Sequence, residues 1–211
     1  MDQPVATLIG DVVGSRGTRD RAVLHARLAD SLAGVNDLLH PAVPLRITVG
    51  DEYQGVFASV GAALAAAFRL RLALAPDVDV RHGVGWGAVT VLAEDPRVED
   101  GPGWWAARAA IEHVEAAERG ATRAVRTAYR RSEGVGGPEP DAVNAALLCR
   151  DTLFAGASSR SLGVLRGLLS GMSQSEIAAA EHVSASAVSQ RVRRDGLAAL
   201  VESDGLLAGL R

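Results

Sequence analysis

Hydrophobic and polar positions in the first half of the chain follow two periods, one typical of strands and one typical of helices. Two stretches, Arg19–Leu39 and Val60–Ala75, carry apolar residues at helical spacing. Runs of strand length cover Val5–Val13, Leu45–Val49, Gln54–Ala58 and Val78–Leu92. The order βαββαβ predicts a ferredoxin-like α+β fold, in which the first and third strands pair antiparallel at the centre of a sheet backed by both helices.

The second half of the chain is expected to be mainly helical. A polar loop over residues 94–101 leads into a predicted helix over residues 102–118, and alternation over residues 122–130 predicts one last strand. The segment SEGVGGPEP, residues 132–140, has the glycine and proline content of a linker. All of the chain beyond it has helical periodicity. The predicted domains are a ferredoxin-like domain over residues 1–133 and an all-α domain over residues 134–211.

The all-α part contains a pattern typical of a helix-turn-helix. Ser173 and Glu176 have the spacing of a capping box at the start of a helix. The residues that follow predict a helix over 177–182, a turn at Val183-Ser184 and a second helix over 185–194. With residues 158–169 as the preceding helix, the segment predicts a unit of three helices.

The second helix of this unit carries serine, glutamine and arginine side chains and no acidic one, a set suited to base edges and phosphates. The alternatives are an ordinary helical hairpin with a solvated face and a module that binds protein. The capping box, the turn length and the positive charge favour DNA as the partner. The candidate DNA-contacting residues are Ser186, Ser189, Gln190, Arg191, Arg193 and Arg194.

Composition sets limits on these predictions. Apolar residues make up 48% of the chain and charged residues 22%, which is typical of a folded globular protein. The net charge of -3 excludes a protein that is basic along its whole length, so a DNA-binding surface has to be local. A single cysteine, Cys149, excludes an intramolecular disulfide, and neither a signal peptide nor an apolar run of membrane-spanning length is recognisable. We expect a cytoplasmic protein that does not enter the membrane.

Two aspartates are expected at one edge of the sheet. Asp11 ends the first strand and Asp51 lies at the hairpin that opens the third, so antiparallel pairing of these strands brings both carboxylates together. Two carboxylates beside a phosphate can hold Mg²⁺, and the loop Gly14-Ser15-Arg16 can offer backbone N–H groups to that phosphate. The alternative is that both aspartates are turn and capping residues.

The motifs around these aspartates resemble the core of the class III nucleotidyl cyclases. The segments that carry the resemblance are IGDVVGS, ITVGDEYQGVF and VRHGVGWGAVTV, and it runs from about Thr7 to Arg108. It implies metal binding by Asp11 and Asp51, a nucleotide ligand of the ATP or GTP class, and a transition-state role for Arg108. It also implies a homodimer in which Arg108 of one protomer faces the two aspartates of the other.

Two departures from the cyclase pattern favour regulation over catalysis. Trp104 stands where that family has an asparagine, and Ile47 stands where it has a purine-selecting lysine. Arg46 is one position away and would face the other side of its strand. We therefore assign no catalytic residue, and expect Trp104 to stack on a base while Trp105 packs in the core. The rival hypotheses are an active Mg²⁺-dependent cyclase or other nucleotide-processing enzyme, and a degenerate domain that only dimerises.

The whole chain is similar to the bacterial SatD family, in which a cyclase-like domain of this kind precedes a helix-turn-helix. The segments GDVVGSR, GDEYQGVF and GPGWWAAR carry this similarity. It implies the domain architecture more than an activity. We expect a DNA-binding transcription regulator whose cyclase-like domain senses a nucleotide or mediates dimerisation.

Overall fold

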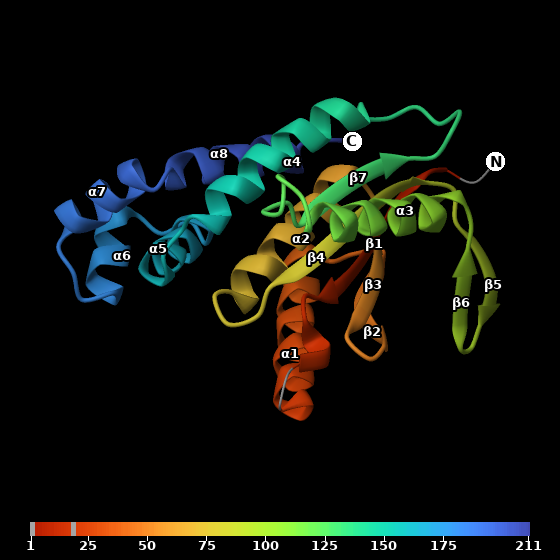
Figure 1. The fold of residues 1–211 in the computed structure, drawn as a ribbon, viewed down its shortest axis with the longest axis horizontal. Helices are drawn as coiled ribbons and strands as arrows, with labels where there is room; N and C mark the ends of the chain where they lie inside the picture. The colour runs from red at the N-terminus through yellow and green to blue at the C-terminus, as the bar shows by residue number, and fades with distance from the viewer. Residues whose placement is uncertain (1–2, 18–19) are drawn as a thin grey trace.

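A five-stranded sheet with the order β2-β3-β1-β4-β7 forms the centre of the protein (Figure 1). The structure is a computed structural model and describes residues 3–17 and 20–211. As predicted, β1 and β3 pair antiparallel in the middle of the sheet; β4 is antiparallel to β1, and β7 is parallel to β4. The predicted α+β fold is confirmed. The strands are β1 (Val5–Val12), β2 (Val43–Val49), β3 (Glu52–Phe57), β4 (Val80–Gly87) and β7 (Thr127–Arg131).

Helices cover both faces of this sheet. Helices α1 (Arg21–Leu39) and α2 (Val60–Leu74) lie on one face, and α3 (Pro102–Ala117) lies on the other. Successive residues of a strand point to opposite faces, so Leu8 packs in the cluster with α1 and α2 while Ile9 packs in the cluster with α3. The sheet is therefore buried between two helical layers.

Two glycines of β4 allow α3 to lie directly on the sheet. A Cβ atom at Gly83 would lie 2.2 Å from the carbonyl oxygen of Ala107, and one at Gly85 would lie 2.2 Å from the carbonyl oxygen of Gly103. Thr7 adds a hydrogen bond from its Oγ1 to the same Gly103 carbonyl, at 2.8 Å. The backbone of the helix and the backbone of the strand are thus in contact, with no side chain between them.

Replacing Gly85 with alanine is expected to lower the free energy of unfolding by about 1–3 kcal/mol, because the added methyl group must push α3 away from the sheet. Urea denaturation followed by circular dichroism measures the effect. The control is Gly34→Ala on α1, where nothing lies within 4 Å of an added Cβ. That change should stabilise the protein by about 0.5–1 kcal/mol. If Gly85→Ala were as well tolerated as the control, the close packing of α3 would be contradicted.

The segment between β4 and α3 forms a hairpin, so the predicted continuous strand and polar loop are both wrong in detail. Strand β4 ends at Gly87, and β5 (Thr90–Glu94) pairs antiparallel with β6 (Arg97–Asp100) away from the main sheet (Figure 1). The polar residues can form a strand because Arg97 pairs with Glu94 across the turn at 3.0 Å. This charge pairing between strands is invisible to a pattern of apolar residues.

Helix α4 (Pro140–Ala155) covers the outer edge of the sheet along β7. The amide side chain of Asn144 accepts from the backbone nitrogen of Tyr129 and donates to its carbonyl oxygen, both at 2.9 Å. Asp151 accepts from the backbone nitrogen of Thr127 at 2.9 Å. These side chains occupy hydrogen-bonding positions that a further strand would otherwise take, which protects the edge from pairing with another chain.

The predicted linker is held against the sheet. The indole nitrogen of Trp86 donates to the carbonyl oxygen of Gly136 at 2.8 Å, and the hydroxyl of Tyr129 donates to that of Pro138 at 3.3 Å. Helix α4 begins at Pro140, so the boundary predicted near residue 133 falls within this loop. The division of the chain into two domains stays a prediction.

The last helix, α8 (Leu197–Ala208), packs against the sheet part of the protein, which consists of the main sheet and the helices α1, α2 and α3. Leu207 packs in the same buried cluster as Leu147 of α4 and the residues of β1 and α2. The backbone nitrogen of Gly61 at the start of α2 donates to the carbonyl oxygen of Leu210 at 2.9 Å. Helices α4 and α8 therefore share a hydrophobic core with the sheet.

Three further helices pack together at the end of the molecule opposite the β5–β6 hairpin (Figure 1). Their contact is apolar, through Leu165, Ile177 and Val188, all of which are buried. No helix in the described part of the chain is both long enough and apolar enough to cross a membrane. The three helices are α5 (Ser159–Leu169), α6 (Gln174–Ala180) and α7 (Ala185–Arg194).

Candidate functional site

Asp11 and Asp51 lie at the same end of the sheet. Gly10 of β1 is paired with Tyr53 of β3, so the next residue of β1 lies beside the β2–β3 hairpin. The backbone nitrogen of Val12 donates to Oδ2 of Asp51 at 3.2 Å. The predicted meeting of the two aspartates at one edge is confirmed, and their role in binding a metal stays a prediction.

The carboxylate of Asp11 is already engaged by an arginine. Arg81 of β4 donates from Nε to Oδ1 at 2.6 Å and from Nη2 to Oδ2 at 3.0 Å. The same guanidinium lies 3.5 Å from Glu115 and 3.3 Å from Glu118, both contributed by the α3 side of the sheet. Burial raises the pKa of the Asp11 carboxyl above its usual value, Arg81 opposes that rise, and the charge of Asp51 adds to it.

These residues do not fit a bound Mg²⁺ as they stand. The guanidinium of Arg81 takes both oxygens of Asp11, and one oxygen of Asp51 accepts a backbone N–H group. Over residues 3–17 and 20–211, no group of three or more His, Cys, Asp or Glu side chains is placed to hold a metal ion. A cation held mainly by oxygen ligands needs more free oxygens than this edge offers.

Replacing Arg81 with glutamine should make the protein sensitive to Mg²⁺. The change removes the charge that balances Asp11 and is expected to lower the free energy of unfolding by about 1–3 kcal/mol in EDTA. Millimolar Mg²⁺ should restore part of this loss, because the freed carboxylate of Asp11 and the nearby carboxylate of Asp51 repel each other and attract a cation. Thermal unfolding in EDTA and in Mg²⁺ measures both effects. The melting temperature of the wild-type protein is expected to be the same under the two conditions. A wild-type melting temperature that rises with Mg²⁺ would contradict the role of Arg81.

The predicted phosphate loop lines a small cavity. Gly14 takes a positive φ of 71°, and a single 3₁₀ turn, Ser15–Gly17, follows it. Ser15 is buried and faces a cavity of about 300 Å³, and the side chain of Arg16 lies outside the described part of the structure. The cavity combines the hydroxyl of Ser15, the carboxylate of Asp51, the guanidinium of Arg21 and the imidazole of His25. Its other lining residues are Ala22, Leu24, Leu28 and Gly50.

Arg108 pairs within its own chain. Its Nη1 and Nη2 donate to the two carboxylate oxygens of Glu52, each at 2.9 Å. That Arg108 faces Asp11 and Asp51 of a partner protomer stays a prediction, and within one protomer its partner is Glu52. Because α3 lies directly on the sheet, the side chain reaches the β2–β3 hairpin of the same protomer.

The two tryptophans at the start of α3 are placed opposite to the prediction. Trp104 is 8% exposed and packs with Ile9 and Val56, so its ring offers no free surface for stacking on a base. Trp105 is 62% exposed, and its indole nitrogen donates to Asp100 at 2.8 Å. Consecutive helical residues are separated by about 100°, and the first of the two turns toward the sheet. The assignments of Trp104 to stacking and Trp105 to the core are therefore wrong in this structure.

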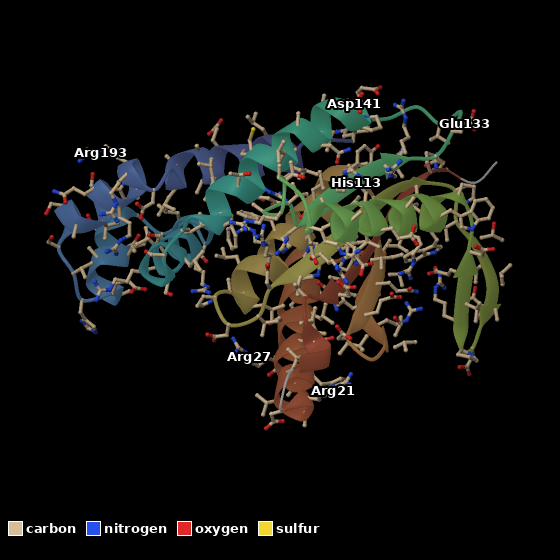
Figure 2. The ribbon with its side chains drawn as sticks, in the orientation of Figure 1. Arg21, Arg27, His113, Glu133, Asp141 and Arg193 are labelled. Carbon is tan, nitrogen blue, oxygen red and sulfur yellow. The ribbon has the colours of Figure 1, made fainter. Side chains whose placement is uncertain are left out.

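Helix α7 presents a polar face to solvent. Ser186, Gln190 and Arg193 are exposed and recur at the spacing of one helix face, and Ser189 and Arg191 are half-buried beside it. Figure 2 labels Arg193, which projects at the end of the molecule farthest from the β5–β6 hairpin. The face is basic, and it is the part of α7 that a partner can reach.

The last predicted contact residue, Arg194, is less free. It is exposed, yet its Nε donates to Oδ1 of Asp195 at 2.7 Å. The predicted capping box before α6 is confirmed. The hydroxyl oxygen of Ser173 accepts from the backbone nitrogen of Glu176 at 3.2 Å, and the backbone nitrogen of Ser173 donates to the Glu176 carboxylate at 2.7 Å. Ser184 caps α7 through its side chain alone, which accepts from the backbone nitrogen of Ala187 at 3.2 Å.

The sheet edge that carries Asp11, Asp51 and Glu52 is called the acidic edge below. Sequence reasoning missed two of its residues, Arg81 and Glu52. A signal existed for the first of them. In the antiparallel pairing of β1 with β4, Asp11 is directly opposite Arg81, and cross-strand pairs of opposite charge stabilise sheets. No comparable signal pointed to Glu52, since its partner Arg108 lies on a helix from a distant part of the chain.

Known proteins resemble this chain at the level of solved structures and of a sequence family. The chain resembles the dimeric guanylyl cyclase domain of the RhoGC fusion protein from the fungus Blastocladiella emersonii, with 17% identity over 53% of this chain and 74% of that one and a TM-score of 0.45. It also resembles the guanylate cyclase domain of RhGC from Catenaria anguillulae, with 15% identity over 52% of this chain and 72% of that one and a TM-score of 0.42. A third similar structure is the adenylyl cyclase CyaB from P. aeruginosa, with 12% identity over 50% of this chain and 69% of that one and a TM-score of 0.41. No curated protein sequence matches the chain. The family model described as the SatD family matches residues 5–203, and the chain belongs to the SatD family.

Proposed function

We propose that this chain is a DNA-binding transcription regulator and that α7 lies in the major groove of the DNA. The observation that carries the proposal is the exposed face of α7, where Ser186, Gln190 and Arg193 lie together at the end of a compact unit of three helices. A helix that presents arginine, glutamine and serine to a major groove can contact both base edges and phosphates. The rest of α7 is fixed by Val188 and Val192, which are buried.

The proposal assigns the sheet part of the protein to regulation, as a nucleotide-sensing and dimerising domain. Two ion pairs support this choice over catalysis: Arg81 engages Asp11, and Arg108 engages Glu52. In the hypothesis of an active cyclase, these groups must hold metal and stabilise a transition state. In the sensing role that we propose, the nucleotide binds beside the cavity lined by Ser15 and Asp51.

The test of DNA binding uses the full-length protein and sheared genomic DNA. Repeated selection is expected to recover fragments that share a two-fold-related site, and the affinity for a recovered duplex should fall roughly a hundredfold between low and physiological salt, because several phosphates are neutralised. Recovery of random fragments only, or an affinity that salt does not change, would contradict the proposal.

The test of nucleotide sensing is calorimetric titration of ATP and GTP in EDTA and in Mg²⁺. Binding without turnover is the expected result for a sensor. Formation of a cyclic nucleotide, detected by chromatography of the same samples, would favour the cyclase hypothesis. The absence of binding under both conditions would leave dimerisation as the role of the domain and would contradict nucleotide sensing.

The proposal includes a homodimer formed through the β5–β6 hairpin. Leu92 is 63% exposed and Val98 45% exposed on this hairpin, and an isolated two-stranded ribbon is marginally stable in water unless it packs on something. We expect a dimer at tens of micromolar by light scattering, and a monomer for Leu92→Glu. The control is Leu206→Glu on α8, an exposed leucine at a different surface. A dimer lost in Leu206→Glu and kept in Leu92→Glu would contradict this interface.

A further inference from the structure

A second cavity lies where the sheet part meets the C-terminal helices, away from the acidic edge. It has a volume of about 410 Å³, within the range of sites for small molecules. Its walls come from the end of α2, the segment between α2 and β4, the loop before β7, and the turn from the end of α4 to the start of α5. Three arginines line it, Arg71, Arg123 and Arg126, against one aspartate, Asp79.

Two of these arginines share a single carboxylate. Arg71 donates from Nε to Oδ1 of Asp79 at 3.2 Å, and Arg126 donates from Nε to Oδ2 at 2.6 Å. Arg123 is exposed at the mouth of the cavity. Glu118 reaches Arg126 only at 4.0 Å and lies closer to Arg81, at 3.3 Å. The lining therefore carries more positive than negative charge.

The charge behind the cavity wall does not remove this excess. Asp151 is fully buried and lies 3.1 Å from Nη1 of Arg71 and 3.6 Å from Nε of Arg150. Arg150 is also fully buried, and its Nε and Nη1 have no hydrogen-bond partner among the described residues. Asp151 thus balances only one of the two arginines that it contacts. Four arginines around this junction, counting Arg150, face Asp79 and Asp151; Glu118 lies 4.0 Å from Arg126, and Asp204 is already paired with Arg69 at 3.1 Å.

Hydrogen-bond donors remain available toward a ligand. Within the described residues, the ion pairs and hydrogen bonds of Arg71 use Nε and Nη1, and those of Arg126 use the same two atoms. Nη2 of each arginine is left to donate. The remainder of the lining is mostly apolar, with Pro76, Ala157 and Leu162 among it. A cationic end and an apolar wall match an anion that has an apolar body.

We propose that this cavity binds a small organic oxyanion, whose phosphate or carboxylate group contacts Arg71, Arg123 and Arg126 and whose apolar part lies against Leu162. Such a ligand would touch the sheet part through Arg71 and the helical part through the segment between α4 and α5. It would therefore stabilise the junction between them. This site is separate from the one named in the proposed function, and its ligand needs no metal.

The experiment titrates the full-length protein with phenyl phosphate, with benzoate and with inorganic phosphate, all in EDTA, by calorimetry. The variants are Arg123→Glu, which reverses an exposed charge of the lining, and Ala155→Trp, which fills the cavity from an exposed position. The control is Arg119→Glu, the same charge change at an exposed residue outside the lining. Circular dichroism confirms that each variant is folded.

The expected result is saturable binding of phenyl phosphate or benzoate, tighter than that of inorganic phosphate, and a rise in melting temperature. Affinity should fall about tenfold or more in Arg123→Glu and in Ala155→Trp, and should stay within about twofold in Arg119→Glu. Stronger binding of phenyl phosphate than of benzoate would identify the oxyanion as a phosphate, and the reverse as a carboxylate. No binding of any probe, or equal affinity in all variants, would overturn the proposal.

Discussion

Replacing Gln190 and Arg193 together with alanine is expected to weaken binding to a selected DNA duplex by at least about 30-fold, since each lost base contact costs about 1–3 kcal/mol. Both side chains are exposed on the same face of α7, where no neighbour in the described chain shields them. Their removal takes away contacts to DNA without opening a cavity in the protein. Fluorescence anisotropy with a labelled duplex measures the affinity.

The control for this experiment is Arg119→Ala, which removes one positive charge from an exposed position beyond the end of α3. We expect it to leave the affinity within about twofold, because screening limits the effect of a distant charge. Arg194→Ala should have a smaller effect than the double change, since Asp195 already holds the Arg194 side chain at 2.7 Å. If the double variant bound DNA as tightly as the parent, α7 would not be the helix that reads the duplex.

Replacing Asp151 with asparagine is expected to lower the free energy of unfolding by about 3–5 kcal/mol, the usual cost of leaving a buried charge without its partner. Asp151 is fully buried and contacts Arg71 and Arg150, which are also buried. An asparagine has the same shape, and its oxygen can still accept from the backbone nitrogens of Arg126 and Thr127, at 2.7 and 2.9 Å in the parent. The loss therefore measures the charge more than the packing.

Chemical denaturation provides the measurement, with Asp141→Asn as the matched control. Asp141 is exposed in the first turn of the same helix, where losing its charge should cost less than about 1 kcal/mol. A similar small loss for Asp151→Asn would mean that water or structural rearrangement neutralises the two arginines. The proposed excess of positive charge at the nearby cavity would then lose much of its basis.

Local patterns were sufficient for most of the secondary structure. Apolar spacing predicted the helix observed as α2 within one residue of its end, and the start and end of α7 were predicted without error. The capping box was predicted from the Ser173 and Glu176 spacing alone. These features depend on residues within one or two turns of each other, so the chain itself holds all the information that they need.

The acidic edge divides into a part that could be predicted and a part that could not. Antiparallel pairing of neighbouring strands was enough to bring Asp11 beside Asp51. The cation beside Asp11 is Arg81, however, and the cation beside Glu52 is Arg108 of the same protomer. Which positive group satisfies which carboxylate depends on how closely α3 approaches the sheet, a distance that sequence spacing does not encode.

Sequence alone therefore determined most of the elements, the order of the four ferredoxin-like strands, the meeting of Asp11 with Asp51, and the polar face of α7. Tertiary structure decided the burial of Trp104, the exposure of Trp105, the separate β5–β6 hairpin, and the return of α8 to the shared core. The physical reason is the separation along the chain over which each interaction acts. Periodicity and capping act between residues close in the chain, whereas burial and ion pairing depend on which distant surfaces come into contact and at what separation.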